Sequence, residues 1–292
     1  MRLKSVLWIL LLLAPLACGG GGGNSPTTAT SGCQPSVGHP PLIRPGTLIT
    51  AVNASSPPGQ YLDKNGNFAG LYVEVLAAVA KELCLTPDWV NIPFDAQIPG
   101  LQGGRWDATS SGTFYTEARS KIVQLVPFAT QGISISTAKN NPLHITSAKD
   151  LAGRKVAVEA PGFEYDTTVS VNKSQVASGL KAMDILTFQL LPEAYQALLS
   201  GQVDAVITGD QSVSYYLQKG QFGAVMQGIS PSAICLAFED PKVATAAAEA
   251  LNKMKQDGTY DKIFKKYALQ VEEWPRTFSL QTGPLVVPTP TG

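Results

Sequence analysis

Apolar and polar positions change their spacing repeatedly between residues 48 and 267, and these changes predict strands and helices in alternation. The run 48–52 is short and apolar, as in a buried strand, whereas apolar positions in 70–83 recur at helical spacing. Further strands are predicted at 89–92, 105–110, 156–159, 185–188 and 205–208, and further helices at 95–101, 194–199, 212–218, 241–254 and 260–267. This alternation predicts an α/β fold with mainly parallel sheets, and the length of the chain favours two lobes.

The stretch 107–119 combines a strand end, a small-residue turn and a helix start. The strand is expected to break at Ser111 and Gly112, because a glycine lets other groups approach the backbone closely. Thr116 is placed to cap the helix that follows. Free N–H groups, hydroxyls and the Arg119 guanidinium would then form a concave site suited to a carboxylate, which a guanidinium can bind through two hydrogen bonds. An ordinary turn followed by a solvated arginine fits this stretch, taken alone, equally well.

The first 17 residues have the features of an export signal. Arg2 and Lys4 precede an apolar core at 6–13, which is too short to span a bilayer. Residues 18–41 are predicted to be a lipidated cysteine, Cys18, and a flexible tether rich in glycine, threonine and serine. Pro15 stands where lipoprotein signals usually carry an aliphatic residue. Plain secretion with loss of Cys18 is therefore the alternative.

Charge and composition exclude several classes of function. Lysine and arginine total 22 and aspartate and glutamate total 22, so removal of Arg2 and Lys4 leaves 20 against 22, a net charge of about −2. No basic stripe indicates a nucleic-acid partner, and beyond the signal no apolar run is long enough to cross a membrane. His39 and His144 are isolated and no phosphate-binding or catalytic motif is present, so neither a metal nor a cofactor is expected.

Seven segments together resemble the bacterial extracellular solute-binding proteins of family 3, the receptors of amino-acid ABC importers. One is the stretch 107–119, which reads D-A-x-x-S-G-x-x-x-T-x-x-R like the family's block at this place. The others are residues 46–58, 65–70, 93–101, 150–158, 201–207 and 254–263, in the family's order. The resemblance extends from about Pro45 to Tyr267.

This resemblance implies the two-lobed fold of type II periplasmic binding proteins, in which each lobe is a mainly parallel sheet flanked by helices. Residues 122–136 would carry the chain to the second lobe and the chain would return near Ala233, so that two crossings form a hinge. The expected division is lobe 1 at 42–136 and 233–269, lobe 2 at 137–232, and an irregular tail at 270–292.

The cysteines fit an oxidising compartment. Some family members carry cysteines at the positions of Cys33 and Cys84, which implies a disulfide between these two residues here. Such a bridge would fix the N-terminal arm to lobe 1. Cys235 lies in an apolar strand and is expected to be a buried free thiol.

The family pattern also implies a ligand cleft between the lobes. Arg119 matches the arginine that holds the carboxylate of α-amino acids, and Ser111 and Gly112 match the turn beside it. Phe114, however, stands where the family usually offers a hydroxyl. The anion side of the cleft is therefore expected to be retained, with a more aromatic wall.

Lobe 2 departs further from the family. Gly162 keeps an N–H group at the start of a helix, but Phe163 replaces a hydroxyl residue. The family's aspartate that pairs with the ligand's ammonium corresponds to Gly209, which Asp210 follows. Asp210 is the nearest candidate for the missing carboxylate.

The first loop of lobe 1 departs as well. Asn53 replaces a common aspartate, Ser56 stands where an aromatic residue often covers the ligand, and Gly59 replaces a phenylalanine. With a retained carboxylate anchor and a doubtful ammonium anchor, the sequence favours a small carboxylate ligand that is more apolar or aromatic than polar amino acids. An ordinary amino acid held by Asp210 or Glu164 is the alternative.

These expectations favour a binding module. It would be an exported monomer, tethered to the membrane only by the lipid on Cys18. Its lobes would close on a small-molecule ligand and present that ligand to an ABC transporter permease. The alternative is an enzyme like the cyclohexadienyl dehydratases of the same fold, with Glu164 or Asp210 as general acid. A sensory module is a weaker alternative, because such proteins usually continue into a transmembrane helix.

Overall fold

The computed structural model describes residues 33, 36–38, 41–225, 228–267, 277–281 and 283–285. The predicted export signal, Cys18 and most of the predicted tether lie outside these residues. The described residues from 36 onward belong to one compact unit, which contains the elements below. No helix among the described residues has the length and apolar character needed to cross a membrane.

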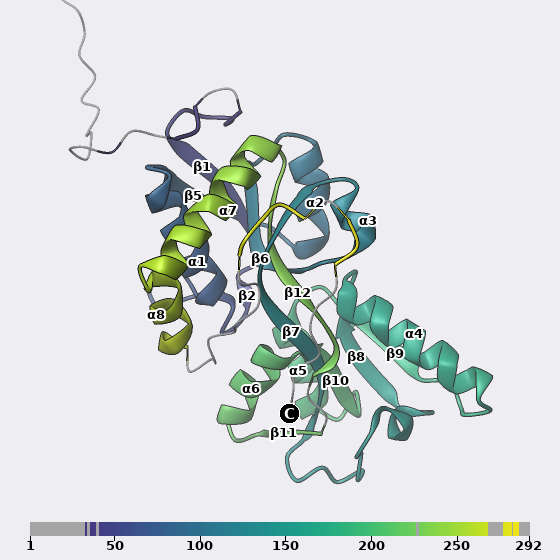
Figure 1. Ribbon diagram of the computed structural model, residues 1–292. Coiled ribbons are helices and arrows are strands. Elements are labelled where there is room, and N and C mark those ends of the chain that lie inside the picture. The colour runs from purple at the N-terminus through teal and green to yellow at the C-terminus, as the bar shows by residue number, and fades with distance from the viewer. Residues whose placement is uncertain are drawn as a thin grey trace, which may run out of the picture. The chain divides into compact units, whose positions relative to one another are not determined.

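One mixed sheet combines strands from most of the described chain. Its strands are β1 (Thr47–Val52), β5 (Thr86–Asn91), β6 (Ala108–Phe114), β7 (Gln124–Ala138), β8 (Lys155–Glu159), β9 (Asp184–Phe188), β10 (Ala205–Gly209), β11 (Phe222–Ala224) and β12 (Ile229–Phe238). They follow the order β5-β1-β6-β12-β7-β10-β8-β9, and β11 also pairs with β7 (Figure 1). A small separate sheet contains β2 (Ser55–Ser56), β3 (Gln60–Leu62) and β4 (Phe68–Ala69).

Two long strands, β7 and β12, divide the large sheet into two lobes. Strands β5, β1 and β6 are parallel on one side, and β10, β8 and β9 are parallel on the other. β7 pairs antiparallel with β12 near its start and with β10 near its end. The chain therefore crosses between the lobes twice, which confirms the predicted two-lobed α/β architecture with a two-crossing hinge.

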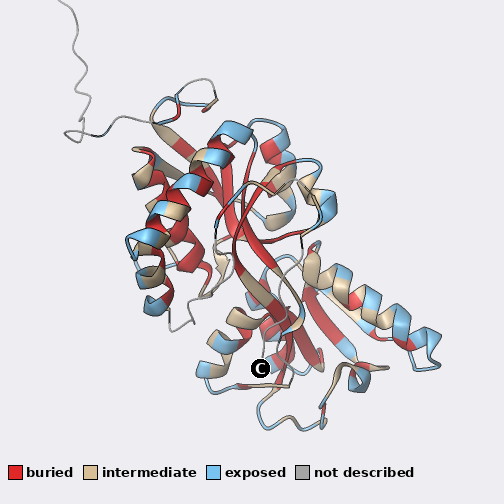
Figure 2. Ribbon diagram, viewed as in Figure 1, coloured by how far each residue is buried: buried red, intermediate tan, exposed pale blue. Residues whose placement is uncertain are grey.

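Helices cover both lobes. They are α1 (Leu71–Glu82), α2 (Phe94–Gln102), α3 (Glu117–Ser120), α4 (Phe163–Ala177), α5 (Leu191–Leu199), α6 (Asp210–Gln218), α7 (Pro241–Gln256) and α8 (Thr259–Lys266), with a 3₁₀ turn at Ala148–Leu151. α1, α7 and α8 lie together against lobe 1, whereas α4, α5 and α6 belong to lobe 2 (Figure 1). Buried residues follow the strands and the inner faces of the helices (Figure 2).

Local sequence explains the principal helices. Leu71, Val75 and Val79 are buried and recur every four residues, so they form the inner face of α1. Asp240 caps the start of α7, because its carboxylate accepts a hydrogen bond from the backbone N–H of Lys242 at 2.7 Å. A proline at the first position of α7 further favours this start.

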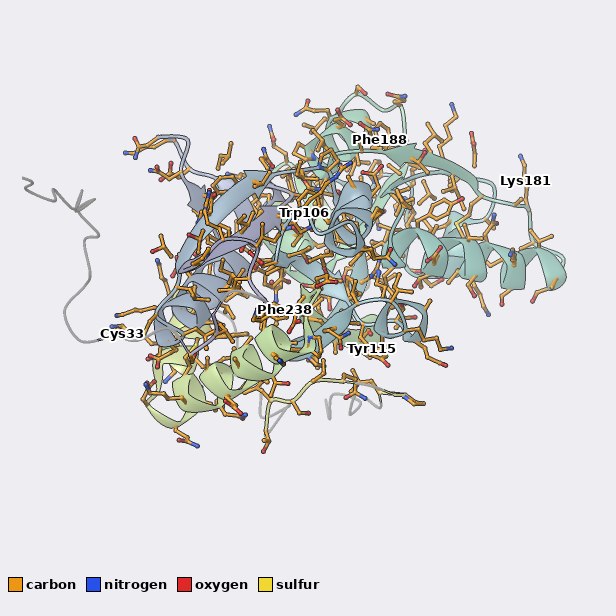
Figure 3. All side chains as sticks on the ribbon, turned by 90° about the horizontal axis from the view of Figure 1, so that it is seen from above. Cys33, Trp106, Tyr115, Lys181, Phe188 and Phe238 are labelled. Carbon is orange, nitrogen blue, oxygen red and sulfur yellow. The ribbon has the colours of Figure 1, made fainter. Side chains whose placement is uncertain are left out.

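Aromatic packing defines the interior of lobe 1. Trp106 and Phe238 both lie inside this lobe (Figure 3). The Trp106 indole N–H donates to the Gln97 carbonyl at 2.9 Å. A Cβ on Gly100 would lie only 1.8 Å from the Trp106 ring, so a glycine at this place on α2 allows the indole to pack.

The predicted strand break at Ser111 and Gly112 is wrong. β6 continues to Phe114, because β12 pairs with it on both sides of this point. The register shifts between Cys235 and Ala237 of β12, so the extra residues of β6 form a bulge. Gly112 has a φ of 61°, which glycine adopts without strain, so the small residues bend the strand instead of ending it.

The three cysteines among the described residues have the predicted states. Cys33 and Cys84 are disulfide-bonded to each other. Cys84 follows Leu83, the C-cap of α1, and has a φ of 59°, in the left-handed region common at helix ends. Cys235 is a free, fully buried thiol in β12, and burial raises its pKa.

The described part of the C-terminal tail packs against lobe 1. Phe278 is 3 % exposed and belongs to the main hydrophobic core. Its backbone N–H donates to the Asn252 side-chain oxygen and its carbonyl accepts from the Asn252 amide, each at 2.8 Å. Gln281 forms an isolated bridge with Leu125 of β7, and the Tyr115 hydroxyl donates to the Gly283 carbonyl. Residues 277–281 and 283–285 of the tail are thus irregular in path but anchored to lobe 1.

We expect Phe278→Ala to destabilise the protein by about 3–5 kcal/mol, because it removes a buried aromatic side chain and leaves a cavity. Leu62→Ala is the control, since Leu62 is 44 % exposed and should change stability little. Urea unfolding followed by circular dichroism measures both. Equal stability of the two variants would show that the tail does not contribute to the core.

Candidate functional site

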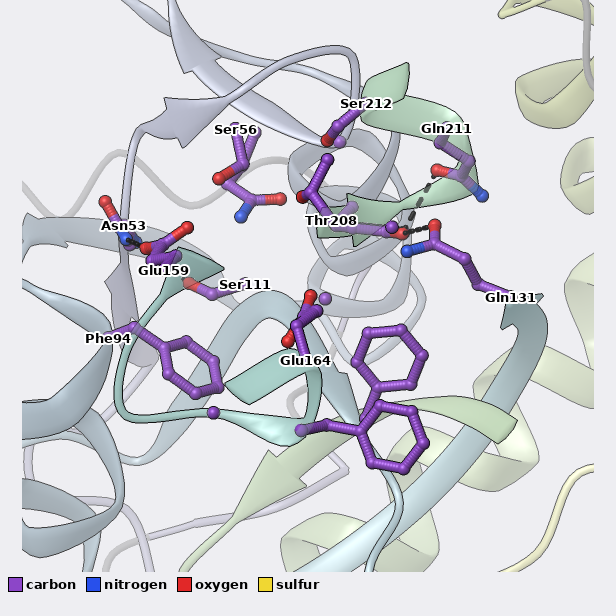
Figure 4. Close-up of a pocket in the computed structure, with 18 of the residues that line it drawn as sticks. Asn53, Ser56, Phe94, Ser111, Gln131, Glu159, Glu164, Thr208, Gln211 and Ser212 are labelled. Atoms are coloured by element: carbon purple, nitrogen blue, oxygen red, sulfur yellow. Dashed lines mark hydrogen bonds between the residues drawn. The ribbon is translucent and has the colours of Figure 1, made fainter. Parts of the chain in front are cut away.

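A cavity lies between the two lobes, and side chains from both line it (Figure 4). Its volume is about 50 Å³, well below the roughly 300 Å³ of small-molecule pockets, so the lobes must move apart to admit a ligand. The lining residues are Asn53, Ser56, Gly59, Gln60, Tyr72, Phe94, Ser111, Gly112, Phe114, Arg119, Gln131, Glu159, Pro161, Gly162, Phe163, Glu164, Thr208, Gly209, Gln211 and Ser212.

Arg119 is held in the cavity wall by its own loop. Thr116 caps α3 as predicted, because its hydroxyl accepts a hydrogen bond from the Arg119 backbone N–H at 3.1 Å. One guanidinium N–H donates to the Phe114 carbonyl at 2.8 Å, and the guanidinium lies 5.4 Å from the centre of the Phe94 ring. Among the described residues no carboxylate is within ion-pair distance of Arg119. Its other N–H groups are therefore available to an anion.

The Ser111 hydroxyl can act only as a hydrogen-bond donor toward the cavity. Its oxygen accepts hydrogen bonds from the Asn53 backbone N–H at 2.8 Å and from the Gln97 side-chain amide at 2.9 Å. A hydroxyl has two acceptor sites and one proton, so both acceptor sites are used and the O–H remains as a donor. Ser111 thus presents a donor to the cavity, as a carboxylate ligand requires.

Tyr72 forms an aromatic part of the wall. Its ring lies so close to Gly59 and Gly112 that a Cβ at either position would approach it to 2.5 Å and 2.7 Å. Its hydroxyl lies 3.1 Å from the side-chain oxygens of both Gln131 and Gln211. Because Gln211 belongs to α6, this hydroxyl links lobe 1 to lobe 2.

Two phenylalanines stack across the cavity. Phe114 ends β6 in lobe 1, and Phe163 begins α4 in lobe 2. Their ring centres are 4.4 Å apart with an angle of 17° between the planes, a stacked arrangement. Phe114 and Phe163, which stand where hydroxyl residues were expected, therefore contact each other and join the two lobes.

Two glutamates of lobe 2, Glu159 and Glu164, bring carboxyl groups to the cavity. Glu159 ends β8, and its side chain accepts a hydrogen bond from the Asn53 amide at 2.8 Å. Glu164 lies in the first turn of α4. In Figure 4 the Asn53–Glu159 pair and the Gln131–Gln211 pair occupy opposite sides, with Glu164 between them.

Burial and charge shift the acidity of these groups. Burial and the neighbouring Glu164 carboxylate raise the pKa of Glu159 to about 8, although the Asn53 hydrogen bond opposes the shift. Burial also raises the pKa of Glu164, with Arg119 opposing it. Burial lowers the pKa of Arg119, and Glu164 counteracts this effect. The guanidinium of lobe 1 and the carboxyl groups of lobe 2 thus share one poorly solvated space.

The family model of the bacterial extracellular solute-binding proteins, family 3, matches residues 48–270. The chain belongs to this family. An L-cystine-binding protein of Escherichia coli K12 is 24 % identical over 227 residues, which cover 76 % of this chain and 82 % of that protein. Among these relatives is also the lysine/arginine/ornithine-binding periplasmic protein of the same bacterium, 26 % identical over 78 % of this chain and 88 % of its own length.

Solved structures of this type share the fold. An ancestral arginine-binding protein has been solved with bound glutamine and with bound arginine, and in both structures it is 32 % identical to this chain with a TM-score of 0.70. The match covers 77 % of this chain in the glutamine complex and 76 % in the arginine complex, and 98 % of the ancestral protein in each. An ancestral amino acid-binding protein described as a precursor of cyclohexadienyl dehydratase is 31 % identical with a TM-score of 0.70, covering 76 % of this chain and 95 % of its own. The type II periplasmic-binding-protein fold predicted from the sequence is therefore confirmed.

Asp210 is near the family's missing aspartate but does not line the cavity. Its carboxylate accepts hydrogen bonds from the N–H groups of Gly132 and Gly228, each at 3.1 Å, and from the Ser134 hydroxyl. It therefore ties α6 to β7 and to the residue just before β12. At Gly209 a Cβ would meet the Gln131 amide nitrogen at 1.9 Å, so Gln131 occupies the place of a side chain there.

The structure brings the other eight predicted ligand residues together. Those that line the cavity are Asn53, Ser56, Ser111, Gly112, Phe114, Arg119, Gly162 and Phe163. Their contact with a ligand stays a prediction. Among the described residues no cluster of three or more histidine, cysteine or acidic side chains is arranged to hold a metal ion.

Several lining residues were not found from the sequence. Tyr72 lies within a regular helical pattern, and Gln131 lies in a long strand. Glu159 ends a strand without any motif. The departures at Gly59 and Gly209 were the available signals, because a lost side chain leaves room for another residue.

We expect Glu159→Gln to gain stability relative to the unchanged protein as the pH rises from about 5 to about 8. A carboxyl group with a raised folded-state pKa binds more protons when folded than when unfolded in this window, so its stabilisation is lost as pH rises. Glutamine does not titrate, and its oxygen can still accept from Asn53. The midpoint of thermal unfolding as a function of pH measures the difference. A pH-independent difference would contradict the assignment.

Proposed function

We propose that the protein is the substrate-binding receptor of an ABC importer and captures an amino acid in the cavity between its lobes. One observation carries this proposal: donors from lobe 1 and carboxyl groups from lobe 2 line the same cavity. Arg119 and Ser111 suit a carboxylate, and Glu159 and Glu164 suit an ammonium group. An α-amino acid carries both groups and can join the two lobes.

The structure favours an amino acid over an amino-free carboxylate. The sequence favoured a more apolar or aromatic carboxylate because no carboxylate for an ammonium group had been identified with certainty. Asp210 does not fill that role here, because its oxygens accept hydrogen bonds from the hinge strands. Glu159 and Glu164 offer two carboxyl groups within the cavity instead. An ammonium group placed beside them would not be left unpaired.

Ligand binding would strengthen a closure that the lobes already favour. Three contacts cross the cavity: the Asn53–Glu159 hydrogen bond, the Phe114–Phe163 stack and the hydrogen bond between Tyr72 and Gln211. A ligand shifts the equilibrium only if it binds the closed form better than the open form. An amino acid held by Arg119 on one side and glutamates on the other meets this condition.

The receptor acts outside the cytoplasm, in line with its membership of an extracellular family. We further propose that it is a monomer held at the membrane by a lipid on Cys18, from which it delivers the ligand to a permease. The apolar segment before Cys18 and the glycine-rich segment after it support this anchor.

An enzyme remains the second candidate. The cavity contains two carboxyl groups whose pKa values are raised by burial, and such a group can act as a general acid. A dehydratase acting on a cyclohexadienyl acid would use one of them to protonate the leaving hydroxyl. Chromatography of each bound compound after incubation tests this alternative, because a receptor returns its ligand unchanged.

We expect Arg119→Ala to lower the affinity for an amino acid about ten- to a hundredfold, the equivalent of one charged hydrogen bond. Lys121→Ala is the control, because Lys121 is an exposed cation directly after α3 that pairs with Glu117. Isothermal titration calorimetry with L-arginine and L-glutamine measures both variants. The unchanged protein should also bind these amino acids better than 3-phenylpropionate. Equal affinity of the two variants would refute the carboxylate anchor.

We expect Cys18→Ser to release the protein from the membrane, because serine lacks the thiol that carries the lipid. Fractionation of cells and labelling with a fatty-acid analogue measure the anchor. The unchanged protein should be labelled and found with membranes, and the variant should be unlabelled and soluble. An unlabelled native protein would instead favour plain secretion.

A further inference from the structure

Three ionisable side chains of the cavity set its charge. Arg119 is positive, and Glu159 and Glu164 are negative when ionised. With both carboxyl groups ionised, the cavity therefore carries one positive and two negative charges. An unbalanced charge away from bulk water is unfavourable, so the empty cavity favours retention of a proton.

The groups around Glu159 decide where that proton lies. α4 brings Glu164 and α5 brings Glu193, and a charge on either of these carboxylates disfavours a charge on Glu159. On α6, burial and more weakly a charge on Glu159 raise the pKa of Tyr216, so this phenol stays neutral. Arg119 on α3 acts on Glu164 and favours its charged form. Asp166, also on α4, acts on Arg119. Burial raises the pKa of both carboxyl groups, but Arg119 favours the charged form of Glu164, whereas the charged neighbours of Glu159 are acidic. We therefore assign the retained proton to Glu159.

The contact between Glu159 and Asn53 permits both protonation states. The Asn53 amide donates to one carboxyl oxygen of Glu159 at 2.8 Å. A protonated carboxyl group still has an oxygen that accepts, and the proton resides on the other oxygen. Glu159 can therefore gain or lose a proton while this bond between the lobes is preserved.

We propose that Glu159 and Glu164 select an amino acid with a net positive charge, and that binding of this ligand expels the proton from Glu159 to solvent. This inference rests on the proposed function and specifies its substrate class. The ligand's carboxylate pairs with Arg119, and its two cationic groups balance the two ionised glutamates. The charges of the cavity and the ligand then sum to zero.

A buried acceptor in the cavity wall supports a ligand rich in N–H donors. Gln60 lines the cavity and is 4 % exposed. Its side-chain oxygen has no hydrogen-bond partner among the described residues. A buried acceptor without a partner is unfavourable, and an N–H group from a basic side chain would satisfy it.

Proton release provides a direct test. Titration calorimetry with L-arginine in two buffers of different ionisation enthalpy gives the number of protons released. We expect about one proton at about pH 6 to 7, and an affinity that rises about tenfold per pH unit until the pKa of free Glu159 is reached near 8. L-Glutamine, which has no net charge, should bind more weakly and release no proton.

Two variants test whether the released proton comes from Glu159 or from a neighbouring acidic residue. Glu159→Gln should bind L-arginine without proton release and with an affinity that no longer depends on pH in this range. Glu193→Gln is the matched control and should retain proton release, because Glu193 is exposed on α5 and does not line the cavity.

The outcomes separate this inference from the proposed function. Binding of L-arginine without proton release, or tighter binding of L-glutamine than of L-arginine, would overturn the inference and leave an amino-acid receptor. Proton release that persists in Glu159→Gln would also overturn it. Failure of the unchanged protein to bind either amino acid would refute the amino-acid receptor, and the inference with it.

Discussion

The antiparallel pairing of β7 with β12 is the constraint on which the cavity depends. These strands join the parallel strands of lobe 1 to those of lobe 2 in one continuous sheet. Asp210 reinforces this junction, since its carboxylate accepts hydrogen bonds from Gly132 and Ser134 of β7 and from Gly228 just before β12. Asp210 was expected to lie beside the ligand, but its hydrogen bonds hold α6 against the hinge instead.

At two positions where the family usually has a larger side chain, this chain has a glycine, and another residue fills the space. Gly59 lacks the phenylalanine usual in the family, and the Tyr72 ring from α1 packs against it. Gly209 lacks the usual aspartate, and the amide of Gln131 from β7 lies there. The wall thus keeps its packing while its chemistry changes, and the negative charge moves to Glu159 and Glu164 of lobe 2.

The sequence predicted the parts of the site that depend on local spacing. Arg119 and its cap Thr116 lie three residues apart, and their hydrogen bond follows from helix geometry. Contacts between residues that are far apart in the sequence could not be predicted in this way. The continuation of β6 beyond Gly112 depends on β12, more than a hundred residues later. The insertion of Phe278 into lobe 1 depends on Asn252 of α7. Neither contact leaves a local pattern.

A crystal structure of the protein grown with L-arginine tests the central claim most directly. We expect closed lobes, with the ligand's carboxylate at Arg119 and Ser111. Its cationic groups should lie within hydrogen-bond distance of Glu159 and Glu164, about 3 Å. The Asn53–Glu159 contact should persist beside it. A ligand bound outside this cavity, or with its carboxylate directed to lobe 2 and away from Arg119, would show that Arg119 is not the carboxylate anchor.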